Sequence, residues 1–207
     1  MAQTSLPTTL ETVTGKFVDL VNPDPSDIDI EDIAWSLSRL SRFNGHTIQV
    51  LPYTVGQHSI VVAEEIGKWI DQNTTVITAK ERARLMMYGL LHDASEAYTG
   101  DVSGPLKKIP ELRPVIKKIE NVIQQAIYLS LNINPPTEYE EKEIIKPADL
   151  LAQRIEAYNF MVSRGQNWSN TIPQVSIIKL QTFEMPLPSA QVYKKFLDFY
   201  HTLLQRM

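Results

Sequence analysis

The chain contains no cysteine among its 207 residues. This absence excludes disulfide bonds, metal sites made of thiolates and a cysteine nucleophile. No stretch approaches the roughly 20 consecutive apolar residues that a membrane-spanning helix needs. The first residues also lack the basic start and the apolar core of a secretory signal peptide. From these absences we expect a cytoplasmic protein that has no membrane partner.

The chain also has little net charge. Twenty Lys and Arg residues against 24 Asp and Glu residues give a formal net charge of −4 at pH 7. Such a chain lacks the broad positive surface that binds a nucleic-acid polymer or an anionic membrane, so a phosphate ligand needs a local site. The composition, 43% hydrophobic and 21% charged, is ordinary for a globular protein. We therefore expect a single domain over residues 1–207, with residues 1–27 as an N-terminal extension.

Apolar residues recur at helical spacing through most of the chain. This pattern predicts helices over residues 30–40, 54–70, 78–91, 110–131, 137–161 and 189–205. Pro147 lies inside the fifth of these helices and should kink or interrupt it, because proline lacks a backbone donor. Two short alternating segments, residues 16–21 and 47–51, predict a small β-ribbon. The fold class that we predict is all-α, with at most a short β-ribbon near the N-terminus.

The segment Leu90–Asp101 gathers one imidazole and three carboxylates directly after an apolar run. Charged side chains at the end of a buried helix cost free energy unless something pairs with them, and a metal ion is a common partner. Glu96 follows His92 by four residues and would share its face if the helix continued. Taken alone, this segment is also compatible with a solvated acidic helix end.

Two further polar residues occupy apolar helical surroundings. His58 lies near the buried face of the helix over residues 54–70, and Asp149 lies among alanine and leucine residues. With His92 and Asp93 they offer two imidazoles and two carboxylates, a mixed donor set for a divalent transition ion with positions left for water and substrate. Mn, Fe, Co, Ni and Zn all fit these donors. Such an ion acidifies water and neutralises charge that grows on a phosphoryl oxygen.

The motifs Gln57-His58-Ser59, His92-Asp93-Ala94-Ser95-Glu96 and Lys146-Pro147-Ala148-Asp149 follow one another along the chain. Their order, His, then His-Asp, then Asp, resembles the HD-domain phosphohydrolases, all-helical metal enzymes that act on phosphate esters. With the continuation Thr99-Gly100-Asp101, the motifs are similar to the 5′-deoxynucleotidase branch, which has an arginine and an aromatic residue where this chain has Arg42-Phe43. The resemblance covers residues 30–160 and implies an HD-domain helical bundle.

Carried over by position, the resemblance implies roles for individual residues. The metal ligands would be His58, His92, Asp93 and Asp149. They would hold one divalent ion, with Zn, Co or Mn as candidates, and a second divalent ion could arrive with the substrate phosphates. Glu96 would orient or deprotonate the attacking water, or protonate the leaving 5′ oxygen.

The resemblance also implies residues that contact the substrate. Asp101 would lie near the sugar or assist acid–base chemistry. Arg42 would bind the phosphate, which suits a planar bidentate donor. Phe43 would crowd the 2′ position, where bacterial members have tryptophan. Lys107 is a second candidate for the phosphate.

The activity implied by the resemblance is metal-dependent removal of phosphate from 2′-deoxyribonucleoside 5′-phosphates. Residues 14–46 are similar to viral HD proteins that dephosphorylate dATP, so dATP, with dADP and dAMP, is the best single candidate and deoxyadenosine the product. A viral protein of this kind would work in the host cytoplasm, and HD nucleotidases usually form homo-oligomers. Two alternatives stay open: a general 5′-deoxynucleotidase acting on dNMPs, and a regulatory HD domain that binds nucleotide without turnover. A phosphodiesterase or alarmone hydrolase is disfavoured by Thr99-Gly100-Asp101.

Overall fold

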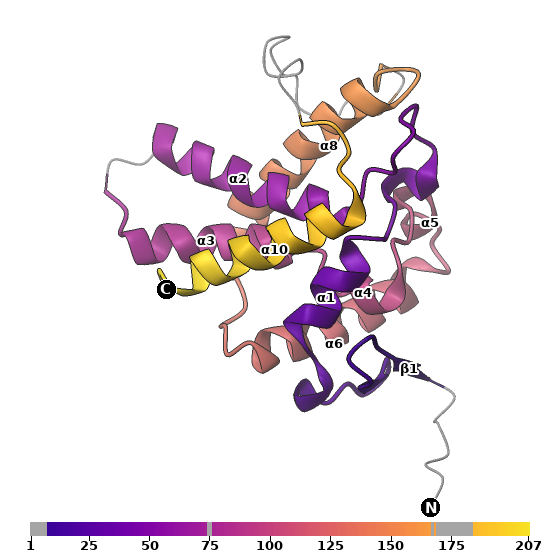
Figure 1. The fold of residues 1–207 in the computed structure, drawn as a ribbon, viewed down its shortest axis with the longest axis vertical. Helices are drawn as coiled ribbons and strands as arrows, with labels where there is room; N and C mark the ends of the chain where they lie inside the picture. Colours follow the sequence, from indigo (N-terminus) through magenta and orange to yellow (C-terminus); the bar gives the residue numbers. More distant parts are fainter. Residues whose placement is uncertain (1–7, 74–75, 167, 169–183) are drawn as a thin grey trace, which may run out of the picture.

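The computed structural model describes residues 8–73, 76–166, 168 and 184–207, and helices account for most of them (Figure 1). The predicted all-α class is confirmed. The helices are α1 (Ile30–Leu37), α2 (Val55–Asn73), α3 (Ala79–Leu91), α4 (Glu96–Thr99), α5 (Gly104–Lys107), α6 (Arg113–Ser130), α7 (Glu138–Glu140), α8 (Lys146–Phe160) and α10 (Ser189–Leu204). Short 3-10 turns η1 (Pro25–Asp27) and η2 (Arg42–Gly45) and a π-helical turn η3 (Glu141–Ile145) complete the helical elements of the described residues.

Helices α2 and α3 form the centre of the fold, with α8 and α10 packed against them (Figure 1). Their contact depends on Gly89, which is buried on α3. A Cβ at this position would lie 2.7 Å from Ile66 Cδ1 and 2.9 Å from the Cα of Ala63 on α2. Only glycine therefore lets the two backbones approach this closely. The approach also brings the start of α2 close to the end of α3, where His58 and His92 are located.

Helix starts follow the signals in the sequence. The Asp29 side chain caps α1 by accepting from the Glu31 amide, and the Thr78 side chain caps α3 by accepting from the Glu81 amide. The capping box that begins at Thr137 is complete, because Thr137 and Glu140 each accept from the other's backbone. Of these three capped helices, α3 leads into the segment with His92 and Asp93.

The predicted strand at residues 16–21 exists, but its predicted partner was wrong. Strand β2 (Phe17–Asp19) pairs antiparallel with β1 (Thr9–Glu11), and residues 47–51 form no strand. The nearer partner is favoured because it needs only a short turn, closed by Gly15 with a positive φ of 81°. Residue Ile48 instead donates its amide to the Phe160 carbonyl at the end of α8.

The predicted interruption at Pro147 is confirmed. The helix that begins at Glu138 widens into the π-helical turn η3, and Pro147 then lies in the first turn of α8, where its missing donor does no harm. Residues 100–110, which lie between two predicted helices, contain the short helix α5. Most of residues 163–188, between the last two predicted helices, lies outside the described residues. Among the described helices, none combines the length and apolarity that crossing a membrane requires.

Candidate metal and phosphoester site

The four predicted metal ligands come from three separate helices and meet at one point. His58 is completely buried in the first turn of α2, His92 ends α3 with Asp93 next to it, and Asp149 lies in the first turn of α8. One ligand atom from each of His58, His92 and Asp149 lies within 4.8 Å of the others. Asp93 joins them, because its Oδ2 is 3.1 Å from His92 Nε2 and 3.6 Å from His58 Nε2.

The hydrogen bonds of both imidazoles leave their Nε2 atoms free for a cation. His58 Nδ1 is 2.6 Å from Glu156 Oε1, and His92 Nδ1 is 2.8 Å from the carbonyl oxygen of Gly89. A carboxylate and a carbonyl only accept, so each Nδ1 carries a proton, and in the neutral imidazole that a metal ion binds each Nε2 carries a lone pair. These two Nε2 atoms are 3.3 Å apart, and His58 Nε2 is also 3.3 Å from Asp149 Oδ1. Lone pairs and carboxylates at such distances repel one another unless a cation lies between them, so the donor set fits a divalent ion.

The electrostatics of the cluster also favour a cation. Burial lowers the pKa of His92, but the carboxylates of Asp93 and Asp149 outweigh this effect and raise the pKa to about 9. Burial raises the pKa of Asp149, but the charges of His92 and Lys146 hold it well below its usual range. The cluster therefore carries an excess of negative charge that attracts positive charge.

Glu96 and Lys107 lie beside the ligands in a paired arrangement. Lys107 Nζ is 2.9 Å from Glu96 Oε1 and 2.9 Å from Glu120 Oε1 on α6. The second Glu96 oxygen is buried and has no hydrogen-bond partner among the described residues. Burial and the charge of Asp93 raise the pKa of Glu96 to about 8, although the charge of Lys107 opposes the shift. Glu96 is thus a carboxyl group able to hold a proton at neutral pH.

Arg42 and Phe43 occupy the strained turn η2. Phe43, Asn44 and Gly45 all have positive φ, at 54°, 51° and 76°, which costs on the order of 1–3 kcal/mol for a residue such as phenylalanine. Arg42 is buried; its Nε lies 3.1 Å from Glu156 Oε2 and its Nη1 lies 3.7 Å from Asp93 Oδ2. The Phe43 ring lies 5.7 Å from the ring of Trp168, centroid to centroid.

Asp101 follows Gly100, whose φ of 78° ends α4 and redirects the chain. Burial and the charge of Asp93 raise the pKa of Asp101, and the charge of Arg42 only partly offsets this rise. Asp101 therefore lies close enough to Arg42 and to Asp93 for their charges to act on it. The structure thus gathers the predicted site residues other than Phe43 around one cluster, whereas the Phe43 ring contacts Arg42 and Trp168.

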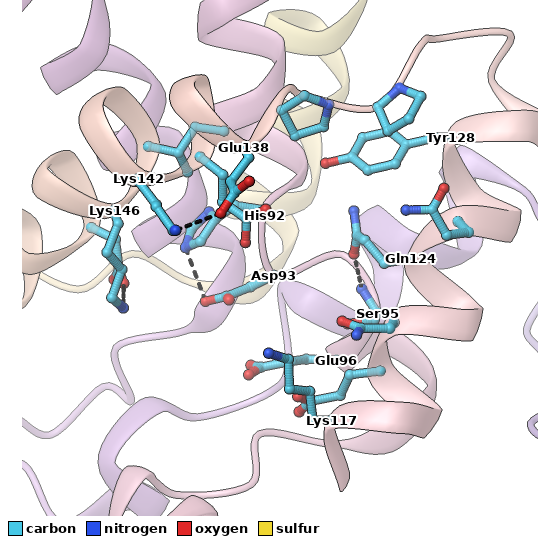
Figure 2. A pocket seen from close by; sticks show the side chains of 18 of the residues that line it. His92, Asp93, Ser95, Glu96, Lys117, Gln124, Tyr128, Glu138, Lys142 and Lys146 are labelled. Atoms are coloured by element: carbon cyan, nitrogen blue, oxygen red, sulfur yellow. Dashed lines mark hydrogen bonds and ion pairs between the residues drawn. The ribbon is translucent and has the colours of Figure 1, made fainter. Parts of the chain in front are cut away.

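A cavity of about 550 Å³ opens from the cluster toward α6 and the segment before α8 (Figure 2). Figure 2 shows His92, Asp93 and Glu96 on its inner side, with Gln124 and Tyr128 of α6 across from them and Lys142 at one edge. Gln124 accepts from the Ser95 amide at 3.0 Å and donates to the Leu91 carbonyl at 2.8 Å, so it fixes α6 against the segment that carries His92. Arg42, Phe43 and Asp101 are not among the residues that line this cavity.

Sequence reasoning missed Glu156. This residue is fully buried on α8, and its carboxylate accepts from His58, Arg42 and Tyr53. A signal was present: Glu156 follows Asp149 by seven residues, which places both on one face of a helix, and it stands between Ile155 and Ala157. The same reasoning that singled out Asp149, an acid in apolar surroundings, applies to Glu156.

Comparisons with known proteins agree with this geometry. The model of the 5′-deoxynucleotidase YfbR-like family matches residues 35–198. An uncharacterized protein of Rhodobacter capsulatus is 33% identical over 145 residues, which are 70% of this chain and 69% of that protein. The uncharacterized protein YfdR of Escherichia coli is 28% identical over 199 residues, 94% of each chain.

Among solved structures, the cyanophage S-2L HD phosphohydrolase DatZ, bound to dA and one catalytic Zn²⁺ ion, has the same fold. The two chains superpose with a TM-score of 0.50 at 18% identity, over 86% of this chain and 98% of that one. The family match spans most of the chain and includes all four residues of the donor cluster. The chain therefore belongs to the YfbR-like 5′-deoxynucleotidase family and is a metal-dependent HD phosphohydrolase.

Proposed function

We propose that this deoxynucleotide phosphohydrolase acts on 2′-deoxyribonucleoside 5′-phosphates, with dATP, followed by dADP and dAMP, as the preferred substrates and deoxyadenosine as the product. The observation that carries the proposal is the convergence of His58, His92, Asp93 and Asp149 beside Glu96, at the inner end of a cavity. The adenine preference is supported by the resemblance of residues 14–46 to viral HD proteins that dephosphorylate dATP, and by the dA bound to the cyanophage relative.

The proposal assigns one divalent ion, Zn, Co or Mn, to His58, His92, Asp93 and Asp149. When bound, this ion supplies positive charge that acidifies water and stabilises the phosphoryl group in the transition state. The proposal also allows a second divalent ion that arrives with the phosphates of dATP. The residues of the chain itself then bind the substrate and move its protons.

Arg42 binds the phosphate in this proposal. Its Nε is occupied by Glu156, and its Nη1 lies 3.7 Å from Asp93 Oδ2, beyond hydrogen-bonding distance, so the Nη groups remain for phosphate oxygens, a geometry that suits the planar guanidinium. Burial lowers the pKa of Arg42, but the nearby carboxylates of Glu156 and Asp93 more than offset this and keep the group protonated. Arg42 thus brings a permanent positive charge to a site otherwise rich in carboxylates.

Glu96 supplies the proton that the leaving group needs. As water attacks phosphorus and the bond to the 5′ oxygen breaks, the protonated Glu96 carboxyl donates its proton to that oxygen, and the deoxynucleoside leaves as an alcohol. Lys107 holds Glu96 by a 2.9 Å contact, so we propose that it positions this acid, and its alternative role as a phosphate ligand would require that contact to open. Asp101 would bind the 3′-hydroxyl, and Phe43 would exclude a 2′-hydroxyl.

The proposal extends to the organisation of the protein. Residues 1–207 would form one catalytic domain with residues 1–27 as an extension; Val18 of β2 is completely buried in the common core. We also propose that the protein works in the cytoplasm and forms a homo-oligomer. The apolar Val115 and Leu129, exposed on α6, could contribute to the subunit interface. Size-exclusion chromatography with light scattering measures the number of subunits.

The function is tested by phosphate and nucleoside release from a panel of dNMPs, dNTPs and rNTPs. The protein is stripped of metal, and Zn, Co, Mn or Mg is added back. His92→Ala should abolish release, whereas His201→Ala, a change at an exposed histidine on α10, should leave it unchanged. Metal-dependent release from dATP well above the other nucleotides is the expected result.

The same panel separates the alternatives. Turnover of every dNMP with dNTPs untouched would replace the dATP assignment by a general 5′-deoxynucleotidase. Tight nucleotide binding with no release under any metal would favour a regulatory HD domain. Release from cyclic or alarmone substrates alone would refute the deoxynucleotide assignment itself.

A further inference from the structure

The carboxylate of Glu156 is fully buried at the junction of three parts of the fold. It lies on α8 and receives Arg42 Nε from η2, the Tyr53 hydroxyl from the segment before α2, and His58 Nδ1 from α2. The three donor–acceptor distances are 3.1, 3.1 and 2.6 Å. One side chain thus contacts both a metal-ligand candidate and the phosphate-binding candidate without lining the cavity itself.

The two oxygens of Glu156 have separate partners. Oε1 accepts from His58 and Tyr53, whereas Oε2 accepts from Arg42. Because the carboxylate next to a guanidinium only accepts, the His58 proton must lie on Nδ1, and its Nε2 must present a lone pair toward His92 and Asp149. The hydrogen bond from Arg42 Nε to Glu156 Oε2 fixes the plane of the guanidinium and does not use its Nη groups.

We propose that Glu156 is a positioning residue that sets both the tautomer of His58 and the orientation of Arg42. It thereby couples the metal site to the phosphate-binding arginine. The His58 half of the proposal rests on the metal site alone, and the Arg42 half rests also on the proposed function. Stability alone gives little reason for this group, because a buried ion pair is often no more stabilising than apolar residues of similar volume.

The test for His58 is a metal titration of Glu156→Gln, which keeps the shape and removes the charge. The side-chain amide of glutamine has one oxygen where glutamate has two. It cannot accept from both Arg42 and His58, so either the guanidinium or the His58 Nδ1 proton loses its acceptor. Calorimetric titration of the stripped protein with Zn²⁺ should show affinity weakened by about 10–100-fold. The matched control is Glu65→Gln, which changes a buried glutamate on α2 that pairs with Lys68; it should bind Zn²⁺ as the unchanged protein does.

The Co²⁺-loaded proteins provide a second readout that a purely structural role would not move. The visible absorption of Co²⁺ should change in Glu156→Gln and stay unchanged in Glu65→Gln. Equal Zn²⁺ affinities and equal Co²⁺ spectra for Glu156→Gln and the unchanged protein would overturn the His58 half of the proposal. If Glu156→Gln does not fold, Glu156→Asp decides: it keeps the buried charge but withdraws the carboxylate from His58 Nδ1, and the proposal requires weaker Zn²⁺ binding, whereas unchanged binding refutes it.

The test for Arg42 uses steady-state kinetics at saturating metal. We expect KM for the best nucleotide to rise on the order of tenfold in Glu156→Gln, a change typical of lost orientation of a charged binding group. An unchanged KM would overturn the Arg42 half alone. Absence of activity in the unchanged protein would refute the proposed function, but the Zn²⁺ titration would still decide the His58 half.

Discussion

Lys107 on α5 holds Glu96 on α4, with Nζ 2.9 Å from Oε1, while the other carboxylate oxygen stays buried and without a hydrogen bond among the described residues. This pairing orients the acid and adjusts its proton affinity at the same time. Burial and the charge of Asp93 raise the pKa of Glu96, and the charge of Lys107 lowers it, which leaves the pKa at about 8. The lysine therefore tunes the group that we assign as the proton donor.

The pH dependence follows from the sign of this shift. A general acid works while it is protonated, so the rate should be sustained below pH 8 and fall as the pH rises through the pKa of Glu96. Lys107→Met removes the charge that lowers this pKa, and the fall should move to higher pH. Profiles of kcat against pH for the two proteins, both saturated with metal, measure the shift.

A control separates the titration of Glu96 from that of other groups. Glu96→Gln cannot donate the proton, and kcat should drop by roughly 10²–10⁴-fold with the loss of general-acid catalysis. Lys108→Met, at the exposed neighbouring position, should leave the profile of the unchanged protein intact. A Lys107→Met profile that falls at the same or a lower pH would contradict the role given to Lys107.

The local signals in the sequence were sufficient for most of the fold. Apolar spacing and caps placed the main helices, because helix boundaries depend on neighbouring residues such as Thr78 and Asp29. The β-ribbon partner was misassigned, since strand pairing depends on which segment the chain brings near: the strand pairs with residues 9–11, and residues 47–51 form no strand. Pairing between segments is a property of the whole fold and not of either segment.

The site shows the same division between local and distant information. His58, His92, Asp93 and Asp149 could be identified because each is an ionisable residue in apolar surroundings or in a recognisable motif. The contacts of Lys107 with Glu96 and Glu120 could not be predicted, because they join α4, α5 and α6 in space. Glu156 carried the same local signal as Asp149, but its contacts could not be predicted, because its partners Arg42 and His58 are 114 and 98 residues away in the chain.

The close contact between α2 and α3 makes a further prediction. Gly89→Ala would place a Cβ 2.7 Å from Ile66 Cδ1 and 2.9 Å from Ala63 Cα, and the latter is backbone that cannot move aside alone. We expect a loss of about 1–3 kcal/mol in the free energy of unfolding from this overpacking. Urea denaturation measures it, and Gly104→Ala, with nothing within 4 Å of the added Cβ, is the control. Equal losses in the two variants would show that packing against α2 is not the cause.

The role proposed for Phe43 at the sugar predicts a change in selectivity. Removing the ring in Phe43→Ala should open space at the 2′ position and reduce the preference for deoxyribose over ribose by roughly 10-fold, the range that a hydrophobic contact provides. The ratio of kcat/KM for dATP and ATP measures this preference. Phe43→Trp should keep it, because a large ring remains. A ratio that Phe43→Ala leaves unchanged would remove Phe43 from the sugar site.

Metal removal should destabilise the protein through the same four ligands. A ligand present at 100 times its dissociation constant stabilises the folded state by about 2.7 kcal/mol, so stripping the ion with a chelator should lower Tm by several degrees, and added Zn²⁺ should restore it. His58→Ala should abolish this response to Zn²⁺, because the variant lacks one of the converging donors. His46→Ala, which removes an exposed histidine, should respond as the unchanged protein does. If Zn²⁺ raised the Tm of His58→Ala as much as that of His46→Ala, the ion would be bound elsewhere and the assignment of the cluster would be wrong.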